Sequence, residues 1–347
     1  MIVITTTTGN FGGIERTIEL LRARAVEGLF IYGVPGKLII RRWSDVKLVL
    51  ALSNALKLAS DEPIFVRNLY TLLWAWVARL LAWSNNRIYF QSPGVYPVQI
   101  FYQFQALGIS KRLSRFLAHA FSLLELFLIS RCAGVFVFND FLMKNYRLWY
   151  PDCILVGKLR VIKPGLDYDW GLSKTEINVR KDGPELLYFG RLDHQKGLEK
   201  LVSCMVHHPG LSLKIIGAGR SEVKLRELAQ GAANIEFVAP ILDKCKLASE
   251  IKSARYTVVP SVYEPYGHVV WEVISLGGIV LTIDRPFGKF SGHGFLETRH
   301  PMVRSFKDLD TLFDFAAHSE VNEPELLCSG LDRTWNDYIR ELEKYCR

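Results

Sequence analysis

Residues 211–232 read LSLKIIGAGRSEVKLRELAQGA and hold one complete strand–turn–helix unit. The run LSLKII is short and rich in branched apolar residues, which is typical of a strand. GAGR supplies a glycine turn, and SEVKLRELAQGA carries its apolar side chains at helical spacing. A strand that feeds directly into a helix is the building unit of a parallel sheet, so this stretch predicts an α/β fold.

The same alternation extends in both directions from this unit. In the second half, strands are predicted at 185–192, 234–240, 255–261 and 279–283, and helices at 194–208, 221–232, 242–254 and 267–277. In the first half, strands are predicted at 1–6, 64–69, 87–92, 134–139 and 159–166, and helices at 14–28, 71–84 and 114–130. We expect two doubly wound Rossmann-like domains facing across a crevice. Their predicted bounds are 1–166 and 167–328, followed by a C-terminal helix in 329–347 that is able to cross back to the first domain.

Length, composition and charge narrow the class of protein. A chain of 347 residues with 49% hydrophobic side chains suits about two folded domains. Its six cysteines lack metal-ligand spacing and fit a reducing compartment, and the start MIVITTTTGN lacks a basic signal-peptide region. We therefore expect a cytoplasmic protein. Residues 1–165 carry 20 Lys and Arg against 9 Asp and Glu, a net +11, which leaves −3 of the total +8 for the rest. The first half is therefore expected to face an anionic partner.

The stretch YEPYGHVVWE at 263–272 places two acids around a predicted helix start. Backbone N–H groups at the beginning of a helix carry partial positive charge, so the turn at Gly267 suits a phosphate group. Glu264 precedes the helix and is expected to point into the crevice, whereas Glu272 lies about one and a half turns inside it.

Three further turns follow predicted strands. GRLDHQKG at 190–197 brings two cations, Arg191 and Lys196, which are able to grip a diphosphate and neutralise a departing one. In GAGR, Gly217 and Gly219 either admit a ligand close to the backbone or form a plain tight turn.

The third turn lies near the N-terminus. GNFGGIER at 9–16 places Gly12 and Gly13 at a helix start, with Glu15 in its first turn. This pattern departs from GxGxxG, which disfavours NAD binding.

These turns together resemble the retaining GT-B glycosyltransferases of glycosyltransferase family 4. The resemblance spans most of the chain and is strongest over 185–283. It implies that Arg191 and Lys196 bind the donor diphosphate, that Glu264 contacts the donor sugar, and that Glu272 binds the ribose. The loop of Pro265, Tyr266, Gly267, His268 and Val269 would contact sugar and phosphate, and Gly12 and Gly13 would face the donor phosphates and the acceptor.

The resemblance also implies a substrate and a reaction. The donor would be a nucleotide-diphosphate sugar, with UDP or GDP as the nucleotide, and no metal or other cofactor would be needed. The anomeric configuration would be retained by attack on the front face of the sugar.

Two departures from the family concern the acceptor side. Many members carry a histidine where this chain has Gln91 and Ser92, and histidine is also common where it has Arg67 and Asn68. Gln91 is able to hydrogen-bond a sugar but not to act as a base. The Asp-Tyr-Asp stretch at 167–169 resembles the DxD of metal-dependent GT-A enzymes, but it lies in the inferred hinge and is interpreted as a turn rather than a metal site.

Two apolar segments of the first half, at 71–87 and 110–131, suggest a membrane partner. Arg79 and Glu125 interrupt them, so neither is a clean membrane span. They either cover the first sheet or place one helix face in the membrane interface. Lys111, Arg112 and Arg115 are the candidates for contact with anionic lipid or with a lipid-diphosphate-linked acceptor.

The leading hypothesis is a transferase that moves a sugar to a glycan or lipid-linked acceptor in cell-surface polysaccharide or glycolipid synthesis, on the inner face of the membrane. A GT-B-type sugar-nucleotide epimerase keeps the fold but depends on histidine and acidic residues that the sequence does not place. A non-catalytic basic protein that binds membrane or nucleic acid is disfavoured by the joint presence of Arg191, Lys196, Glu264 and Glu272. We expect no nucleic-acid partner.

Overall fold

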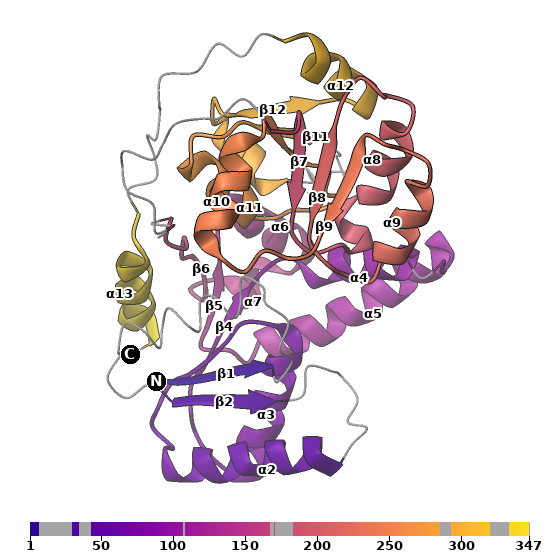
Figure 1. Ribbon diagram of the computed structural model, residues 1–347. Coiled ribbons are helices and arrows are strands. Elements are labelled where there is room, and N and C mark those ends of the chain that lie inside the picture. Colours follow the sequence, from indigo (N-terminus) through magenta and orange to yellow (C-terminus); the bar gives the residue numbers. More distant parts are fainter. Residues whose placement is uncertain are drawn as a thin grey trace. The chain divides into compact units, whose positions relative to one another are not determined.

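The computed structural model describes residues 1–6, 30–34, 43–106, 108–166, 170, 183–284, 293–319 and 333–346. The chain forms two compact units (Figure 1). Unit 1 comprises Met1–Gly165 and Thr334–Arg347, and unit 2 comprises Leu166–Arg333. The sequence predicts the first boundary after residue 166 and a separate segment at 329–347; the structure joins the closing helix to unit 1.

Unit 1 is built on a six-stranded parallel sheet. Its strands are β1 (Ile2–Thr6), β2 (Phe30–Val34), β3 (Ile64–Val66), β4 (Ile88–Ser92), β5 (Gly134–Val137) and β6 (Leu159–Val161). The order across the sheet is β2-β1-β3-β4-β5-β6, with parallel pairing throughout. The chain runs from β1 to one edge and then returns to the other side of β1, which makes the β1–β3 gap the topological switch point of this sheet.

The helices of unit 1 include segments from both ends of the chain. They are α2 (Trp43–Leu58), α3 (Leu69–Ala82), α4 (Tyr96–Ala106), α5 (Lys111–Ile129), α6 (Asp140–Trp149), α7 (Asp152–Leu155) and α13 (Trp335–Cys346). On α13, Trp335, Tyr338 and Leu342 are buried in one cluster with Phe65 of β3 and Phe136 of β5. The expectation that the last helix crosses back to the first domain is therefore confirmed.

Asn68 shows why the third strand is shorter than predicted. The sequence predicts a strand over 64–69, but the structure ends it at Val66. Asn68 instead caps α3: its Oδ1 accepts from the Thr71 N–H at 2.8 Å, and Thr71 Oγ1 accepts from the Asn68 N–H at 3.2 Å. This reciprocal capping box satisfies two N–H groups that a strand would have to pair elsewhere.

Unit 2 contains a second six-stranded parallel sheet. Its strands are β7 (Leu186–Phe189), β8 (Leu213–Ile216), β9 (Ile235–Val238), β10 (Tyr256–Val259), β11 (Val280–Ile283) and β12 (Val303–Phe306). The order is β12-β11-β10-β7-β8-β9. The chain leaves β7 for β8 and β9 on one side and then returns to β10 on the other. The switch point of this sheet therefore lies between β7 and β10, where ligands of open parallel sheets characteristically bind.

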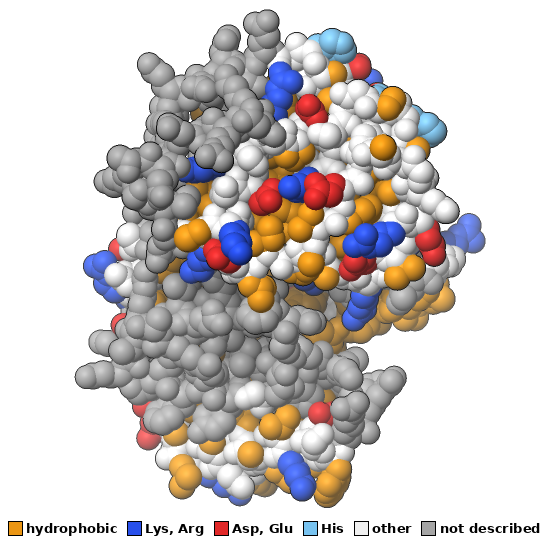
Figure 2. All heavy atoms as spheres, viewed as in Figure 1, with side chains coloured by type: hydrophobic (Ala, Val, Ile, Leu, Met, Phe, Trp, Pro, Cys, Tyr) orange, Lys and Arg blue, Asp and Glu red, His pale blue; other side chains and the backbone are white. Residues whose placement is uncertain are grey.

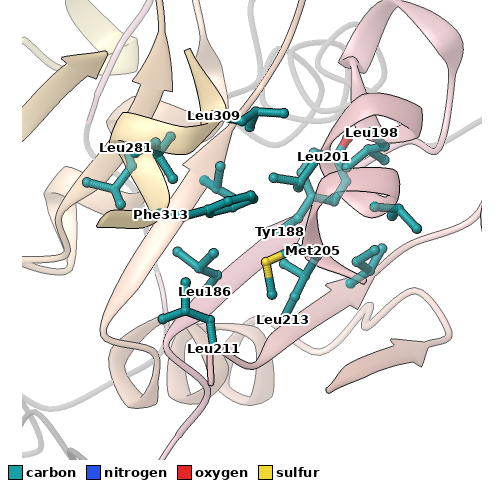
Figure 3. Packing of buried hydrophobic residues seen from close by; sticks show 14 of the residues in the cluster. Leu186, Tyr188, Leu198, Leu201, Met205, Leu211, Leu213, Leu281, Leu309 and Phe313 are labelled. Carbon is teal, nitrogen blue, oxygen red and sulfur yellow. The ribbon is translucent and has the colours of Figure 1, made fainter. Parts of the chain in front are cut away.

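Helices cover this second sheet and supply its core. They are α8 (Leu198–Met205), α9 (Glu222–Leu228), α10 (Lys244–Ser253), α11 (His268–Ser275) and α12 (Leu309–His318), with 3₁₀ turns at η2 (His194–Lys196) and η3 (Gly294–Thr298). Figure 3 shows Leu201 and Met205 of α8 and Phe313 of α12 packed over Leu186 and Leu213 of the sheet. Each such side chain contributes roughly 1.5–3 kcal/mol on burial, so this core holds the strand ends of unit 2 in place.

Gly197 breaks a helix that the sequence predicts as continuous over 194–208. The structure has the short turn η2, then Gly197 at φ 70°, and only then α8. A Cβ at Gly197 would lie 2.1 Å from the Pro260 carbonyl oxygen. Both the left-handed backbone and the close approach require glycine, and both result from contact between the loops that follow β7 and β10.

Candidate donor site in unit 2

The loops after β7 and β10 meet at the switch point of the second sheet. Besides the contact at Gly197, the Val262 N–H donates to the Gln195 carbonyl at 2.8 Å. These loops carry Arg191, Lys196 and Glu264. The topology thus brings together residues that lie about seventy positions apart in the sequence.

Lys196 and Glu264 form an ion pair at the centre of the site. Lys196 Nζ contacts Glu264 Oε2, and their side chains are only 21% and 18% exposed. The Ser261 hydroxyl donates to the same oxygen at 3.3 Å. Burial alone pushes the pKa of Glu264 upward, but the Lys196 ammonium, with smaller effects from His293 and His268, holds that pKa below its ordinary value. Glu264 is therefore ionised at neutral pH.

Arg191 stands at the open edge of the same site. Its side chain is 61% exposed, and Nη1 lies 2.8 Å from Asp193 Oδ2. The loop beneath it is fixed, because the Tyr188 hydroxyl donates to the Arg191 carbonyl at 2.7 Å. Burial raises the pKa of Tyr188, so this hydroxyl keeps its proton. A rigid loop with an exposed guanidinium is suited to binding an anion from solvent.

The start of α11 forms the next wall of the site. Gly267 caps this helix at φ 76° and has no side chain to accept from the first-turn N–H groups, of which the Val270 N–H donates to the Gly267 carbonyl at 2.9 Å. A helix start is a position that suits an anion. A Cβ at Gly267 would lie 2.7 Å from Phe295 Cδ1. Trp271 Nε1 donates to the Tyr266 carbonyl at 3.3 Å, and the Tyr266 and His268 rings are 4.7 Å apart. The predicted donor loop is therefore positioned by Phe295 near Gly267 and by Trp271 at Tyr266.

Other members of this loop and helix are buried or half-buried. Pro265 is buried and Val269 is half-buried. Glu272 is half-buried within α11, and its carbonyl accepts from Ser275 Oγ at 2.7 Å. Ser275 in turn accepts a hydrogen bond from Trp170 Nε1 at 3.0 Å. The helix segment that carries Glu272 is thus tied to the start of unit 2.

His293 is a member of the site that the sequence patterns do not single out. It is fully buried, forms a parallel bridge with Glu264, and is followed by Gly294, whose N–H donates to the Glu264 carbonyl at 3.1 Å. Its Nε2 lies 2.9 Å from the Ile283 carbonyl, and its ring stacks on Phe295. The flanking glycines at 292 and 294 are the one local signal, because the pairing itself is long-range.

Gly217 and Gly219 are explained by packing within the protein. A Cβ at Gly217 would lie 1.9 Å from the Gly190 carbonyl oxygen, and one at Gly219 would lie 2.5 Å from that of Leu192. The Leu192 N–H also donates to the Ala218 carbonyl at 3.0 Å. Both glycines therefore allow the GAGR turn to support the loop that carries Arg191, as the tight-turn alternative expects.

The position of Gln91 contradicts its prediction as an acceptor-side residue. It is fully buried, and its Oε1 accepts from the Tyr338 hydroxyl of α13. Neighbouring residues of a strand point to opposite faces of the sheet, and Gln91 points to the face that α13 covers. It therefore lies beneath the last helix rather than on a surface open to an acceptor.

The remaining acceptor-side candidates fall into three groups. Gly12, Gly13 and Glu15 lie outside the described residues, as do 167–169. Arg67 follows β3 at the switch point of the first sheet, where it is buried with its guanidinium 5.6 Å from the Phe138 ring centroid. The basic group at the start of α5 is exposed and comprises Lys111, Arg112 and Arg115.

The part of the chain that the structure describes shows neither a metal site nor a membrane span. Among those residues, no group of three or more His, Cys, Asp and Glu side chains is arranged to hold a metal ion. No described helix is both long enough and apolar enough to cross a membrane.

Sequence relatives match part of the chain. Residues 172–289 match the family described as glycosyl transferases group 1. An uncharacterized glycosyltransferase of Methanocaldococcus jannaschii is 32% identical over 135 residues, which is 35% of each chain. A glycogen synthase of Mycobacterium tuberculosis is 30% identical over 135 residues, or 37% of this chain and 32% of its own. The matched stretch spans about a third of the length of these relatives.

A solved structure matches the whole chain. Sucrose-phosphate synthase from Thermosynechococcus elongatus superposes with a TM-score of 0.70 at 18% identity, covering 99% of this chain and 97% of that one. The likeness shows the fold: two Rossmann-like α/β domains of the GT-B type, as the sequence predicts.

Proposed function

We propose that the protein is a glycosyltransferase that takes a sugar from a nucleotide-diphosphate donor bound in unit 2. The observation that carries the proposal is the Lys196–Glu264 ion pair beside the exposed Arg191, at the switch point and next to the start of α11. The match of residues 172–289 to glycosyl transferases group 1 supports it, because that stretch contains all of these residues.

The charges suit the bond that such a reaction breaks. When the sugar–diphosphate bond breaks, negative charge grows on the leaving oxygen and positive charge on the sugar ring. Arg191, Lys196 and the N–H groups at the start of α11 would stabilise the leaving diphosphate. Glu264, held ionised, would accept hydrogen bonds from sugar hydroxyls and stabilise the ring. Glu272 would bind the ribose.

The finer assignments extend the same proposal. The two cationic side chains would neutralise the diphosphate without a metal, and the leaving diphosphate would help to deprotonate an acceptor that attacks from the front face, with retention. The acceptor would be a glycan or lipid-linked sugar bound by unit 1, whose segment 1–165 carries the net +11 charge. A peripheral position on the inner face of the cell membrane would bring enzyme and acceptor together.

A thermal-shift screen with UDP, GDP and dTDP tests the donor site. We expect one nucleoside diphosphate to raise the melting temperature, because a ligand that binds only the folded state stabilises it by RT ln(1 + [L]/Kd). Arg191→Ala should weaken this shift, whereas Arg226→Ala, which removes a guanidinium paired with Glu222 on the surface of α9, should leave it unchanged. A chelator should not alter it. If no nucleotide stabilises the protein, the proposal is wrong.

A further inference from the structure

Helix α5 turns an apolar stripe outward. Leu113, Phe116, Ala120, Leu123 and Phe127 are all exposed, with Phe116 at 70% and Leu123 at 62%. Their spacing of three and four residues places them along one side of the helix, and we call this set the apolar stripe. Figure 2 shows hydrophobic side chains at the surface over α5. Side chains of this kind normally face a protein core.

The opposite side of α5 carries polar groups into the protein. Ser114, Ser122 and Glu125 are buried. Glu125 is fully buried, and its two carboxyl oxygens accept from the hydroxyls of Tyr146 and Tyr150, each at 2.5 Å. These hydrogen bonds fix the rotation of α5, so the outward position of the apolar stripe is specified by the fold.

The charges beside the apolar stripe have one sign. Lys111, Arg112 and Arg115 are exposed on the first two turns of α5. The helix contains one acid, Glu125, and that acid is buried. The exposed surface of α5 therefore combines large apolar side chains with basic groups and has no acid to neutralise them.

The end of α3 continues this surface. Trp76 of α3 contacts Phe127 edge-to-face at 5.8 Å, and the Arg131 guanidinium lies 3.6 Å from the Phe127 ring centroid. Beyond them Leu80 is exposed, and Trp83 is 94% exposed in the left-handed conformation at φ 52°. An exposed tryptophan at a helix end is typical of side chains that lie at the boundary of lipid and water.

We propose that the apolar stripe of α5, with the adjoining end of α3, docks unit 1 on an anionic lipid bilayer. The helix would lie in the plane of the interface, with its apolar side chains among the acyl chains and its basic residues among the anionic headgroups. This deepens the membrane contact of the proposed function and does not depend on sugar transfer. A second copy of the chain fits less well, because the exposed side chains of α5 include no acid that could pair with the basic groups of the other copy.

Vesicle co-sedimentation of the full chain tests the surface. We expect binding to vesicles of phosphatidylcholine and phosphatidylglycerol in equal parts, weak binding to phosphatidylcholine alone, and loss of binding as salt rises. Arg112→Gln with Arg115→Gln should weaken binding roughly 30-fold, because each basic residue at such a surface contributes about 1 kcal/mol. Phe116→Ser with Leu123→Ser should weaken it on both kinds of vesicle.

Matched controls lie in unit 2. Lys244→Gln with Lys246→Gln removes two exposed charges, and Val223→Ser with Leu242→Ser removes two exposed apolar side chains. These controls should bind vesicles like the unchanged protein. The proposal is overturned if the unchanged protein ignores anionic vesicles at low salt, or if the controls lose as much binding as the α5 variants.

Two further measurements distinguish membrane docking from self-association and from nucleotide binding. If Phe116→Ser with Leu123→Ser converts an oligomer to a monomer by light scattering and leaves vesicle binding intact, the apolar stripe is a self-association surface and the proposal fails. Thermal shift with nucleoside diphosphate should be the same in every α5 variant. A failure of membrane docking is thereby distinguished from a failure of the donor site.

Discussion

Lys196 and Glu264 depend on each other through one ion pair, so their substitutions should have different consequences. Lys196→Ala leaves a largely buried carboxylate without its cation, so Lys196 no longer opposes the upward effect of burial on the pKa of Glu264. We expect weaker binding of nucleoside diphosphate and lower stability at neutral pH. Glu264→Gln keeps the shape and removes the charge, so it should retain nucleotide binding while transfer falls about 10²-fold or more.

The sign of the pH dependence follows from the lowered pKa of Glu264. Stability from this pair is present above the pKa of an unfolded glutamate and is lost as pH falls through the lower folded pKa. Thermal melts across acidic pH, with Glu222→Gln on the surface of α9 as control, measure this loss. If the melting temperature falls equally with pH in the unchanged protein and in Glu264→Gln, the pair contributes nothing to stability.

Gly267 should be intolerant of a side chain for two separable reasons. Its left-handed backbone costs an alanine about 1–2 kcal/mol, and the new Cβ would also meet Phe295 at 2.7 Å. Gly231 has a similar φ of 83° and open space within 4 Å of an added Cβ, so Gly231→Ala isolates the backbone cost. We expect Gly267→Ala to be the more destabilising in thermal melts and also to weaken the nucleotide shift. Equal losses of stability would rule out the contact with Phe295.

Glu125 should make unit 1 less stable as pH rises. Burial raises its pKa to about 7, against the hydrogen bonds from Tyr146, Tyr150 and the Tyr96 backbone. Because the folded state holds the protonated form, this stabilisation is full below the pKa of an unfolded glutamate and is lost as pH rises through about 7. Glu125→Gln should flatten this dependence in urea unfolding between acidic and neutral pH. If the free energy of unfolding depends on pH equally in Glu125→Gln and in the unchanged protein, another group causes the dependence.

Among the helices and strands, those of unit 2 are predicted well because apolar runs and helical spacing coincide with glycine turns. The errors arise where a tertiary contact overrides a local pattern. Residues 194–208 have helical spacing, but the approach of Pro260 to Gly197 breaks the helix. Residues 64–69 look like one strand, but the capping by Asn68 ends it. Some elements are not predicted at all: β12 and α12 in unit 2, and β2, α2, α4 and α6 in unit 1.

The attachment of α13 to the first sheet offers a test of how that helix is held. Tyr338→Phe removes the donor to Gln91 Oε1, and Gln91 Nε2 already has no partner among the described residues. A buried amide without partners costs about 1–3 kcal/mol. We expect that loss of stability in denaturant unfolding, and its partial recovery when Gln91→Met is added. Additive losses in the double variant would show that the two side chains do not interact.

Over the molecule as a whole, sequence information is concentrated in unit 2. The family match covers 172–289, and Lys196 and Glu264, two of the residues predicted for the donor, pair there at the switch point. The proposed diphosphate site uses short local motifs, glycine turns with cations and a helix start, which a sequence displays directly. The acceptor side of unit 1 offers no such common group. The prediction for Gln91 is wrong there because its burial depends on α13, which lies almost 250 residues further along the chain.

The path of the chain predicts how the molecule responds to loss of its C-terminus. The two segments of unit 1 flank unit 2 in sequence, and α13 contributes Trp335, Tyr338 and Leu342 to the core of unit 1. Ending the chain after Arg333 should therefore raise hydrogen exchange in the strands of unit 1, because their buried face is uncovered. Nucleotide should still protect the loops at 190–197 and 260–267, because all their contacts described above lie within unit 2.

A milder full-length variant guards against general misfolding of the truncated chain. Leu342→Ala should cost about 2–5 kcal/mol and increase exchange in the same strands, with the nucleotide shift preserved. If either change abolished nucleotide protection in unit 2 as well, the two units would not be independent in stability. The donor site would then require α13, although no residue of that helix belongs to unit 2.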